Sequence, residues 1–197
     1  MRTNRKSLKK LSACILAAAM TVTLAAPFSP LAEVKAAGEE AVNLAIDATA
    51  TASESESGTQ YTAAKAIDGN ADRDVEKAQQ SRWATNQLDG ERDAWLQVKM
   101  NGQHWIQSFV IVWERTNITN YKIQVTRASD PQEDDWETVY TKEGSEDISG
   151  EIENIHLPEK VAAESVRLYV EGYNGGTSGW QSVSVYEFQI YEDQIQN

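Results

Sequence analysis

The stretch A-A-K-A-I-D-G-N at 63–70 continues as S-R-W-A-T at 81–85, and Y-E-F-Q-I-Y follows far along the chain at 186–191. The first stretch is a turn rich in oxygen-bearing side chains, and Gly69 within it can adopt the positive φ that tight turns require. The last stretch alternates like a closing β-strand and carries one acidic side chain, Glu187, among apolar neighbours. Together these features predict a β-sandwich tied by a metal ion.

The rest of the sequence predicts further antiparallel strands. Apolar and polar residues alternate over Leu96–Met100, Tyr121–Thr126 and Val166–Glu171, which is typical of strands with one buried face. Phe109–Trp113 is apolar on both faces, as a central strand would be. Turn residues, among them Gly102, separate these segments, and no helical period persists. We therefore predict an all-β fold, an antiparallel β-sandwich of the jelly-roll type.

The N-terminal region predicts a secretory signal peptide over residues 1–36. Five basic residues precede an apolar stretch at 11–26, and Val34–Ala36 offers the small-x-small pattern of a cleavage site. The apolar stretch is too short for a membrane-spanning helix. A lipoprotein acylation site at Cys14 is disfavoured because the apolar stretch follows the cysteine instead of preceding it. Beyond the signal we expect a tail at 37–42, one domain at 43–192 and a second tail at 193–197.

Charge restricts the partners of the secreted product. Removing residues 1–36 takes away six of the 18 basic and one of the 30 acidic residues, which leaves a net charge of −17. Such a surface repels nucleic acid and anionic lipid, so we expect neither nucleic-acid binding nor membrane insertion. The single cysteine, Cys14, leaves with the signal, so the mature chain has no disulfide and depends on its core.

The sequence resembles the discoidin-like domains, also called factor V/VIII type C domains, which in secreted bacterial proteins include the family 32 carbohydrate-binding modules. The resemblance covers about Asn43–Glu192, and its strings occur in the order seen in that family. They are N-L-A at 43–45, T-A-T-A-S at 49–53, A-K-A-I-D-G-N at 64–70, S-R-W-A-T at 81–85, W-L-Q-V-K-M at 95–100, Y-K-I-Q-V-T at 121–126, W-E-T-V-Y at 136–140, V-R-L-Y-V at 166–170 and Y-E-F-Q-I-Y at 186–191.

The resemblance implies an eight-stranded jelly roll, similar to galactose-binding domains, with one structural calcium ion and a ligand surface built from loops. Carried over by position, Asp68 and Glu187 would give carboxylate oxygens to Ca²⁺. Asn70 and Ser81 would give side-chain or carbonyl oxygens, and Lys65 would give a carbonyl. Calcium takes six to eight oxygen ligands at flexible geometry, which suits such a turn.

Residues 71–80 are an insertion relative to the compact form of this loop, so Ser81 is the least secure of the five ligands. The insertion is expected to be a solvated charged loop or a short helical turn. An alternative without metal also remains open. Asp68 would then cap its own backbone, and Gly69 would supply a positive φ.

The resemblance also implies a sugar site. Galactose-binding members commonly hold the sugar with an arginine and an asparagine on one loop, a histidine after the tryptophan of S/T-x-W, and an aromatic platform. Arg115 and Asn120 match the first pair, with Asn117 as a substitute. Ala84 stands where the histidine is expected and Gln87 where a platform is often found. Galactose itself is therefore not the expected ligand.

Other residues could replace the missing parts of the sugar site. Tyr173 or Trp180 could provide the platform, because aromatic faces stack on the C–H face of a pyranose, although packing roles are the alternative for both. Glu54 and Glu56, in the S-E-S-E loop, could accept hydrogen bonds from sugar hydroxyls, with a solvated loop as the alternative. Arg115 could instead form a surface ion pair with Glu114. Trp105 belongs to none of the family strings.

Catalysis has little support, because His104 and His156 stand singly and no nucleophile motif accompanies them. We predict a secreted, non-catalytic, calcium-stabilised module that acts as a monomer and binds an oligosaccharide or polysaccharide. It would bring a bacterial protein to a glycan, as part of or partner to a glycoside hydrolase. The alternative is a cell-adhesion module that recognises a protein or cell-surface partner through the same loops, since the fold does not choose between them.

Overall fold

The computed structural model describes residues 41–88, 92–144, 148, 151–174, 181–193 and 195. The chain divides into two units, Met1–Gly38 and Glu39–Asn197, and all described residues belong to the second. The predicted signal peptide and Trp180 therefore lie outside the described residues. Within the described part, no helix has the length and apolar character needed to cross a membrane.

Seven strands and three short 3₁₀ turns form the described unit. In chain order they are β1 (Thr49–Ala52), η1 (Ala63–Ala66), η2 (Lys77–Gln79), β2 (Trp83–Ala84), β3 (Ala94–Trp113), β4 (Ile118–Thr126), η3 (Glu133–Asp135), β5 (Glu137–Lys142), β6 (Ile152–Tyr173) and β7 (Ser184–Tyr191). All strand pairs are antiparallel. The predicted all-β class is confirmed.

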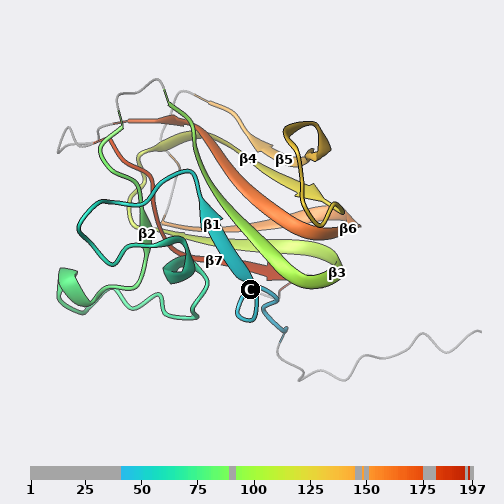
Figure 1. The fold of residues 1–197 in the computed structure, drawn as a ribbon, viewed down its shortest axis with the longest axis horizontal. Coiled ribbons are helices and arrows are strands. Elements are labelled where there is room, and N and C mark those ends of the chain that lie inside the picture. The colour runs from blue at the N-terminus through green and yellow to red at the C-terminus, as the bar shows by residue number, and fades with distance from the viewer. Residues whose placement is uncertain are drawn as a thin grey trace, which may run out of the picture. The chain divides into compact units, whose positions relative to one another are not determined.

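Two long strands, β3 and β6, build the sandwich because each contributes to both layers. The first half of β3 pairs with β1 and with the second half of β6, which continues through β4 to β5. The second half of β3 pairs with the first half of β6 and with β7, which continues to β2. Figure 1 shows β3 and β6 crossing the molecule together. The jelly-roll sandwich is thus confirmed, with seven strands among the described residues where the resemblance implied eight.

The turn that we predicted at Gly102 is a bend inside β3. Gly102 has a φ of 93°, and the register with β6 shifts between Lys99 and His104. The strand assignment nevertheless continues from Ala94 to Trp113. The two segments predicted as separate strands are one strand, because glycine lets the backbone bend through positive φ without ending the ladder.

The core lies between the layers and is rich in aromatic side chains. The inward residues of the predicted alternating segments, such as Leu96, Tyr121 and Leu168, are fully buried. Phe109 and Phe188 stack at 6.2 Å between the paired strands β3 and β7, and Trp113 of β3 meets Tyr121 of β4 edge-on at 5.6 Å across the layers. Such pairs add stability beyond their buried area.

The outer face of the β3–β7 pair is also apolar, and the insertion covers part of it. Val110, Val112 and Tyr186 form a second buried cluster, against which Ala71 of the insertion packs. This cover explains why the sequence is apolar on both faces at 109–113. The prediction of a central strand there is confirmed, since β3 pairs on one side with β6 and on the other with β7.

One glycine is required by close packing between β4 and β6. A Cβ atom added to Gly172 would overlap the hydroxyl of Thr119 and come within 2.9 Å of the side-chain amide of Asn120. We expect Gly172→Ala to lower the free energy of unfolding by about 1–3 kcal/mol, because overpacking forces neighbouring groups to move. Urea denaturation measures this change. Adding Thr119→Ala should recover part of the loss, and unchanged stability of the single variant would contradict the packing described.

Candidate functional site

The early turn lies against the last strand, as the sequence predicts. The backbone N–H of Gly69 donates to Oε1 of Glu187, and Gly69 has a φ of 78°. Ser81 Oγ donates to Oδ2 of Asp68 at 2.5 Å, and Lys65 Nζ lies 3.2 Å from the same oxygen. The structure thus brings four of the five predicted calcium ligands together across the insertion: Lys65, Asp68, Ser81 and Glu187. Ser81 is among them although the insertion separates it from the turn in sequence.

The features of the metal-free alternative are present as well. The backbone N–H of Asn70 donates to Oδ1 of Asp68 at 3.1 Å, so Asp68 does cap its own turn. The amide oxygen of Asn70 in turn accepts a hydrogen bond from the backbone of Asp72 at 3.0 Å. These contacts use one oxygen of Asp68 and leave its other oxygen beside Lys65 and Ser81. The turn alone therefore does not decide between the two interpretations.

Glu187 is the unusual residue of this group. Its side chain is fully buried, and its Oε2 has no hydrogen-bond partner among the described residues. Burial raises the pKa of Glu187 to about 7, the hydrogen bond from Gly69 opposes the rise, and the charge of Asp68 adds to it. A buried carboxyl oxygen without a partner is costly, so this site needs a proton or a cation.

The donor set fits a hard cation such as Ca²⁺. Asp68 and Glu187 offer carboxylate oxygens and Ser81 a hydroxyl, which are the ligand types that calcium prefers. No group of three His, Cys, Asp or Glu side chains suited to a metal occurs in the part of the chain that the structure describes. Backbone or amide oxygens, such as those predicted for Lys65 and Asn70, would have to complete the shell.

The insertion is fixed to the sandwich by one arginine. Arg73 forms an ion pair with Glu151, donates to the backbone carbonyl of Glu114 at 3.4 Å, and lies 5.3 Å from the ring centre of Tyr186. The 3₁₀ turn η2 follows within the insertion, so the short helical turn, one of the two structures expected there, is present. The insertion is therefore part of the surface beside Glu114.

A buried ion pair lies at the centre of this surface. Arg82 is 2% exposed and donates to Glu114 at 2.9 Å and to the hydroxyl of Ser184 at 3.0 Å. Its guanidinium also lies 3.7 Å from the ring centre of Tyr61, whose hydroxyl donates to the backbone carbonyl of Lys77 at 2.7 Å. Glu114 also lies 3.7 Å from Arg115 Nε, so one carboxylate orients two arginines.

These groups enclose a cavity of about 210 Å³. Its lining consists of Glu56, Lys77, Arg82, Ala84, Glu114, Arg115 and Ser182. The side chain of Arg115 is one-third exposed, so its guanidinium reaches solvent at the cavity. The carboxylate of Glu56 makes no hydrogen bond or ion pair with the described residues, and it is free to receive a ligand. The missing histidine position, Ala84, also lies on this wall.

The two predicted asparagines do not join Arg115 in the cavity. Asn117 is buried, and its amide donates to the carbonyls of Asn174 and Ser182 at 2.8 and 3.0 Å. It therefore supports the wall to which Ser182 belongs. The Asn120 side chain accepts a hydrogen bond from Gly144 at 2.8 Å instead. Of the predicted arginine–asparagine pair, only Arg115 lines the cavity.

Glu54 and Tyr173 form a separate group next to the cavity. Glu54 lies 3.6 Å from Arg92 and accepts a hydrogen bond from Asn86 at 3.5 Å, while one of its oxygens is buried without a partner. Tyr173 is 8% exposed, belongs to the core and donates to the carbonyl of Arg92 at 2.6 Å. This placement favours the packing role for Tyr173. Trp180, the other predicted platform, lies outside the described residues.

Two charged cavity residues, Arg82 and Lys77, were not among the predicted ligands. Arg82 stands in S-R-W, a string that the resemblance explains as scaffold, and Lys77 stands in the insertion. Only the charge of these two residues could have indicated them, since their positions depend on how the insertion folds back. Glu56, which the sequence offers together with Glu54 as an acceptor for sugar hydroxyls, does line the cavity.

Comparison with known proteins identifies the family. The model of the F5/8 type C domain matches residues 49–188, which is more than half of the chain. The chain belongs to the F5/8 type C domain family. The match lies within the domain predicted at 43–192. No protein of curated function matches the sequence.

Several solved structures similar to this F5/8 type C domain are carbohydrate-binding modules. Chitosan-binding module 1 of a chitosanase/glucanase from Paenibacillus sp. IK-5 is 28% identical, with a TM-score of 0.61, and the match covers 76% of this chain and 98% of that one. Chitosan-binding module 2 of the same enzyme, in complex with chitotriose, is also 28% identical, with a TM-score of 0.61 and coverage of 76% and 99%. The family 32 module of Clostridium perfringens NanJ, in complex with galactose, shares the fold at 19% identity, a TM-score of 0.58 and coverage of 77% and 98%.

The ion pair beneath the cavity of this F5/8 type C domain can be tested for its structural role. Glu114→Gln removes the charge that balances the buried Arg82, so we expect the free energy of unfolding to fall by about 2–4 kcal/mol. Urea denaturation measures the loss. The matched control is Glu171→Gln, which breaks the exposed pair with Lys122 and should cost less than about 1 kcal/mol. Equal effects of the two variants would contradict a buried, structural pair.

Proposed function

We propose that this chain is a secreted, non-catalytic carbohydrate-binding module that attaches a bacterial protein to a polysaccharide containing amino sugars, of the chitosan type. Glycan binding takes place in the cavity between Glu56 and Arg115. The observation that carries the proposal is this cavity. It is small, five of its seven lining residues are charged, and the guanidinium of Arg82 beneath it is held by Glu114 and Ser184.

The chemistry of the cavity suits a sugar that carries an ammonium group. The guanidinium of Arg115 offers directional donors to vicinal hydroxyl oxygens. The free carboxylate of Glu56 accepts charge-assisted hydrogen bonds from an ammonium group, and these are stronger than bonds between neutral groups. Arg82 is already paired with Glu114 and contributes shape more than net charge.

Two further observations support an amino-sugar polymer. The chitosan-binding modules are 28% identical over nearly their whole length, a closer relation than the 19% of the galactose-binding module. The net charge of −17 that remains without residues 1–36 favours a cationic polymer by long-range attraction. Both arguments are independent of the cavity's geometry.

Calcium has a structural role in this proposal. The ion is bound by oxygens of Asp68 and Glu187, with Ser81, Asn70 and the Lys65 carbonyl as further ligands. It neutralises the buried carboxylate and holds the loops of the cavity to β7. Export by the predicted signal peptide would carry the module to calcium-containing surroundings.

Binding to a glycan array tests the function. We expect the mature chain to bind glucosamine oligomers, and Arg115→Ala to weaken binding about tenfold or more, because a charged hydrogen-bonding group is lost. Lys122→Ala is the control, since it removes a cation that is paired with Glu171 on the exposed surface of β4. That variant should bind as the wild type does.

Other results of the array would contradict the proposal. A blank array, combined with capture of a protein from a cell surface, favours the adhesion alternative. Equal loss of binding in Arg115→Ala and Lys122→Ala would mean that the cavity is not the binding site.

Chelation tests the role of calcium. If calcium is present at about a hundred times its dissociation constant, removing it should lower the melting temperature by about 5–10 °C. Asp68→Ala should abolish this difference. The control Asp72→Ala should retain it, because Asp72 belongs to the same loop but only caps the backbone of Asp74. Identical melting curves with and without chelator would mean that the turn binds no ion.

A further inference from the structure

One tryptophan of the described residues is largely exposed on a strand. Trp105 lies in β3 and is 58% exposed, while its neighbour Ile106 is fully buried. An exposed indole combines an apolar face with one N–H donor, and tryptophan is enriched at interfaces for that reason. Neither the sequence pattern nor the cavity at Arg115 explains this residue.

Register and hydrogen bonds place Trp105 beside Arg127. Trp105 pairs directly with Ala162 of β6, so their side chains share one face. Arg127 Nε donates to the carbonyl of Ala162 at 3.2 Å. Gln103, two residues before Trp105, donates to the carbonyl of Arg127 at 3.5 Å. One strand pair and two hydrogen bonds thus connect the part of the sheet that carries Trp105 to the segment that follows β4.

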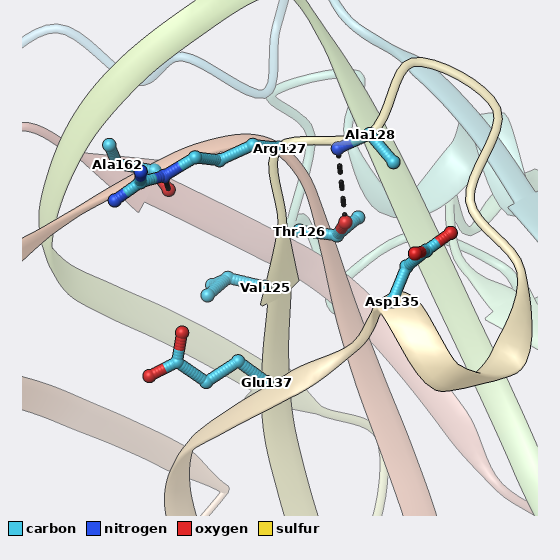
Figure 2. Close-up of a pocket in the computed structure, with 7 residues that line it drawn as sticks. All are labelled: Val125, Thr126, Arg127, Ala128, Asp135, Glu137 and Ala162. Carbon is cyan, nitrogen blue, oxygen red and sulfur yellow. Dashed lines mark hydrogen bonds between the residues drawn. The ribbon is translucent and has the colours of Figure 1, made fainter.

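The same segment lines a second cavity, of about 420 Å³. Its lining consists of Val125, Thr126, Arg127, Ala128, Asp135, Glu137 and Ala162, so it ends at the strand partner of Trp105. Figure 2 shows Arg127 and Glu137 extending to the same side of β4, with Val125 between them and Asp135 on the other side. The carboxylate of Glu137 makes no hydrogen bond or ion pair with the described residues.

This cavity and the Arg115 cavity lie at opposite ends of β4. The strand begins at Ile118, three residues after Arg115, and ends at Thr126, which lines the second cavity. A nine-residue strand extends over roughly 26 Å. In Figure 1 the irregular segments before β3 gather at one end, and η3 with the start of β5 lies at the other. The two cavities are therefore separate sites.

We infer that Trp105, Arg127 and Glu137 form a second carbohydrate-binding site for a pyranose of the same polymer. The indole face of Trp105 stacks on the C–H face of the ring. Arg127 donates to ring hydroxyls, and Glu137 accepts from a hydroxyl or ammonium group. The class of ligand rests on the proposed function, while the site itself rests on the cavity and the exposed indole.

Two sites at opposite ends let one module contact two polymer chains. Linking two weak binding events raises the apparent affinity for a polymer far above that for a short oligosaccharide. The second site therefore predicts tight binding to insoluble chitosan together with weak binding of each short oligomer.

Titration with glucosamine trisaccharide, followed by nuclear magnetic resonance of the calcium-loaded mature chain, tests the inference. We expect two separate sets of shifted signals, one at Arg115 and one at the Trp105 indole N–H and the Arg127 backbone. Trp105→Ala should abolish the second set at Arg127 and leave the first unchanged. It should also lower retention on insoluble chitosan about five- to tenfold. Trp105→Phe, which keeps an aromatic ring, should be retained on chitosan more strongly than Trp105→Ala.

The control is Ile152→Ala, which removes a side chain of similar exposure, 59%, from the far end of β6. It should leave both sets of shifts and the retention unchanged. Shifts at Arg115 with no change at Trp105 and Arg127 would overturn the second site and leave the proposed function standing. Shifts at Trp105 alone would support the second site and contradict the Arg115 site. Silence at both sites would overturn both.

Discussion

A buried carboxylate on the last strand connects the irregular part of this domain to its sandwich. Between β1 and β3 the described chain has only two short 3₁₀ turns and the two-residue strand β2. Glu187 of β7 is fully buried and receives the backbone N–H of Gly69, at the centre of that irregular segment. Since its other oxygen has no hydrogen-bond partner among the described residues, the contact is stable only when a proton or a cation satisfies it. The positions of the loops therefore depend on this one group.

The cavity at Arg115 follows from that attachment. With residues 63–82 fixed to β7, Arg82 is buried against Ser184 and Tyr61 and pairs with Glu114. Glu114 in turn orients Arg115, and the insertion closes the wall through Lys77. In the proposed site, exposed groups would contact the ligand while the groups that support them are buried. This division explains how a site made of loops can be well ordered, because each loop carries at least one anchored side chain.

The sequence predicted the scaffold far better than the site. Strands such as β4 and β7 have local alternation, and Glu187 stands out as one acid among apolar residues, so their roles depend on neighbours in sequence. Gly102 was misjudged because a positive φ can either end a strand or bend it, and only the pairing of β3 with β6 decides. Asn120 matched a family position but contacts Gly144, whereas Lys77 was treated as loop and lines the cavity. Such positions depend on the path of an insertion, which has no periodic pattern to reveal it.

A free carboxylate beside an arginine should select a sugar with an ammonium group. Titrations with the trimers of glucosamine and of N-acetylglucosamine, followed at the signals of Glu56 and Arg115 at low and at high salt, measure this selection. The glucosamine trimer should bind about tenfold more tightly, and this preference should be lost at high salt because screening weakens the attraction. Equal affinity for the two trimers at low salt, or tighter binding of the acetylated one, would mean that the carboxylate of Glu56 does not select the ammonium group.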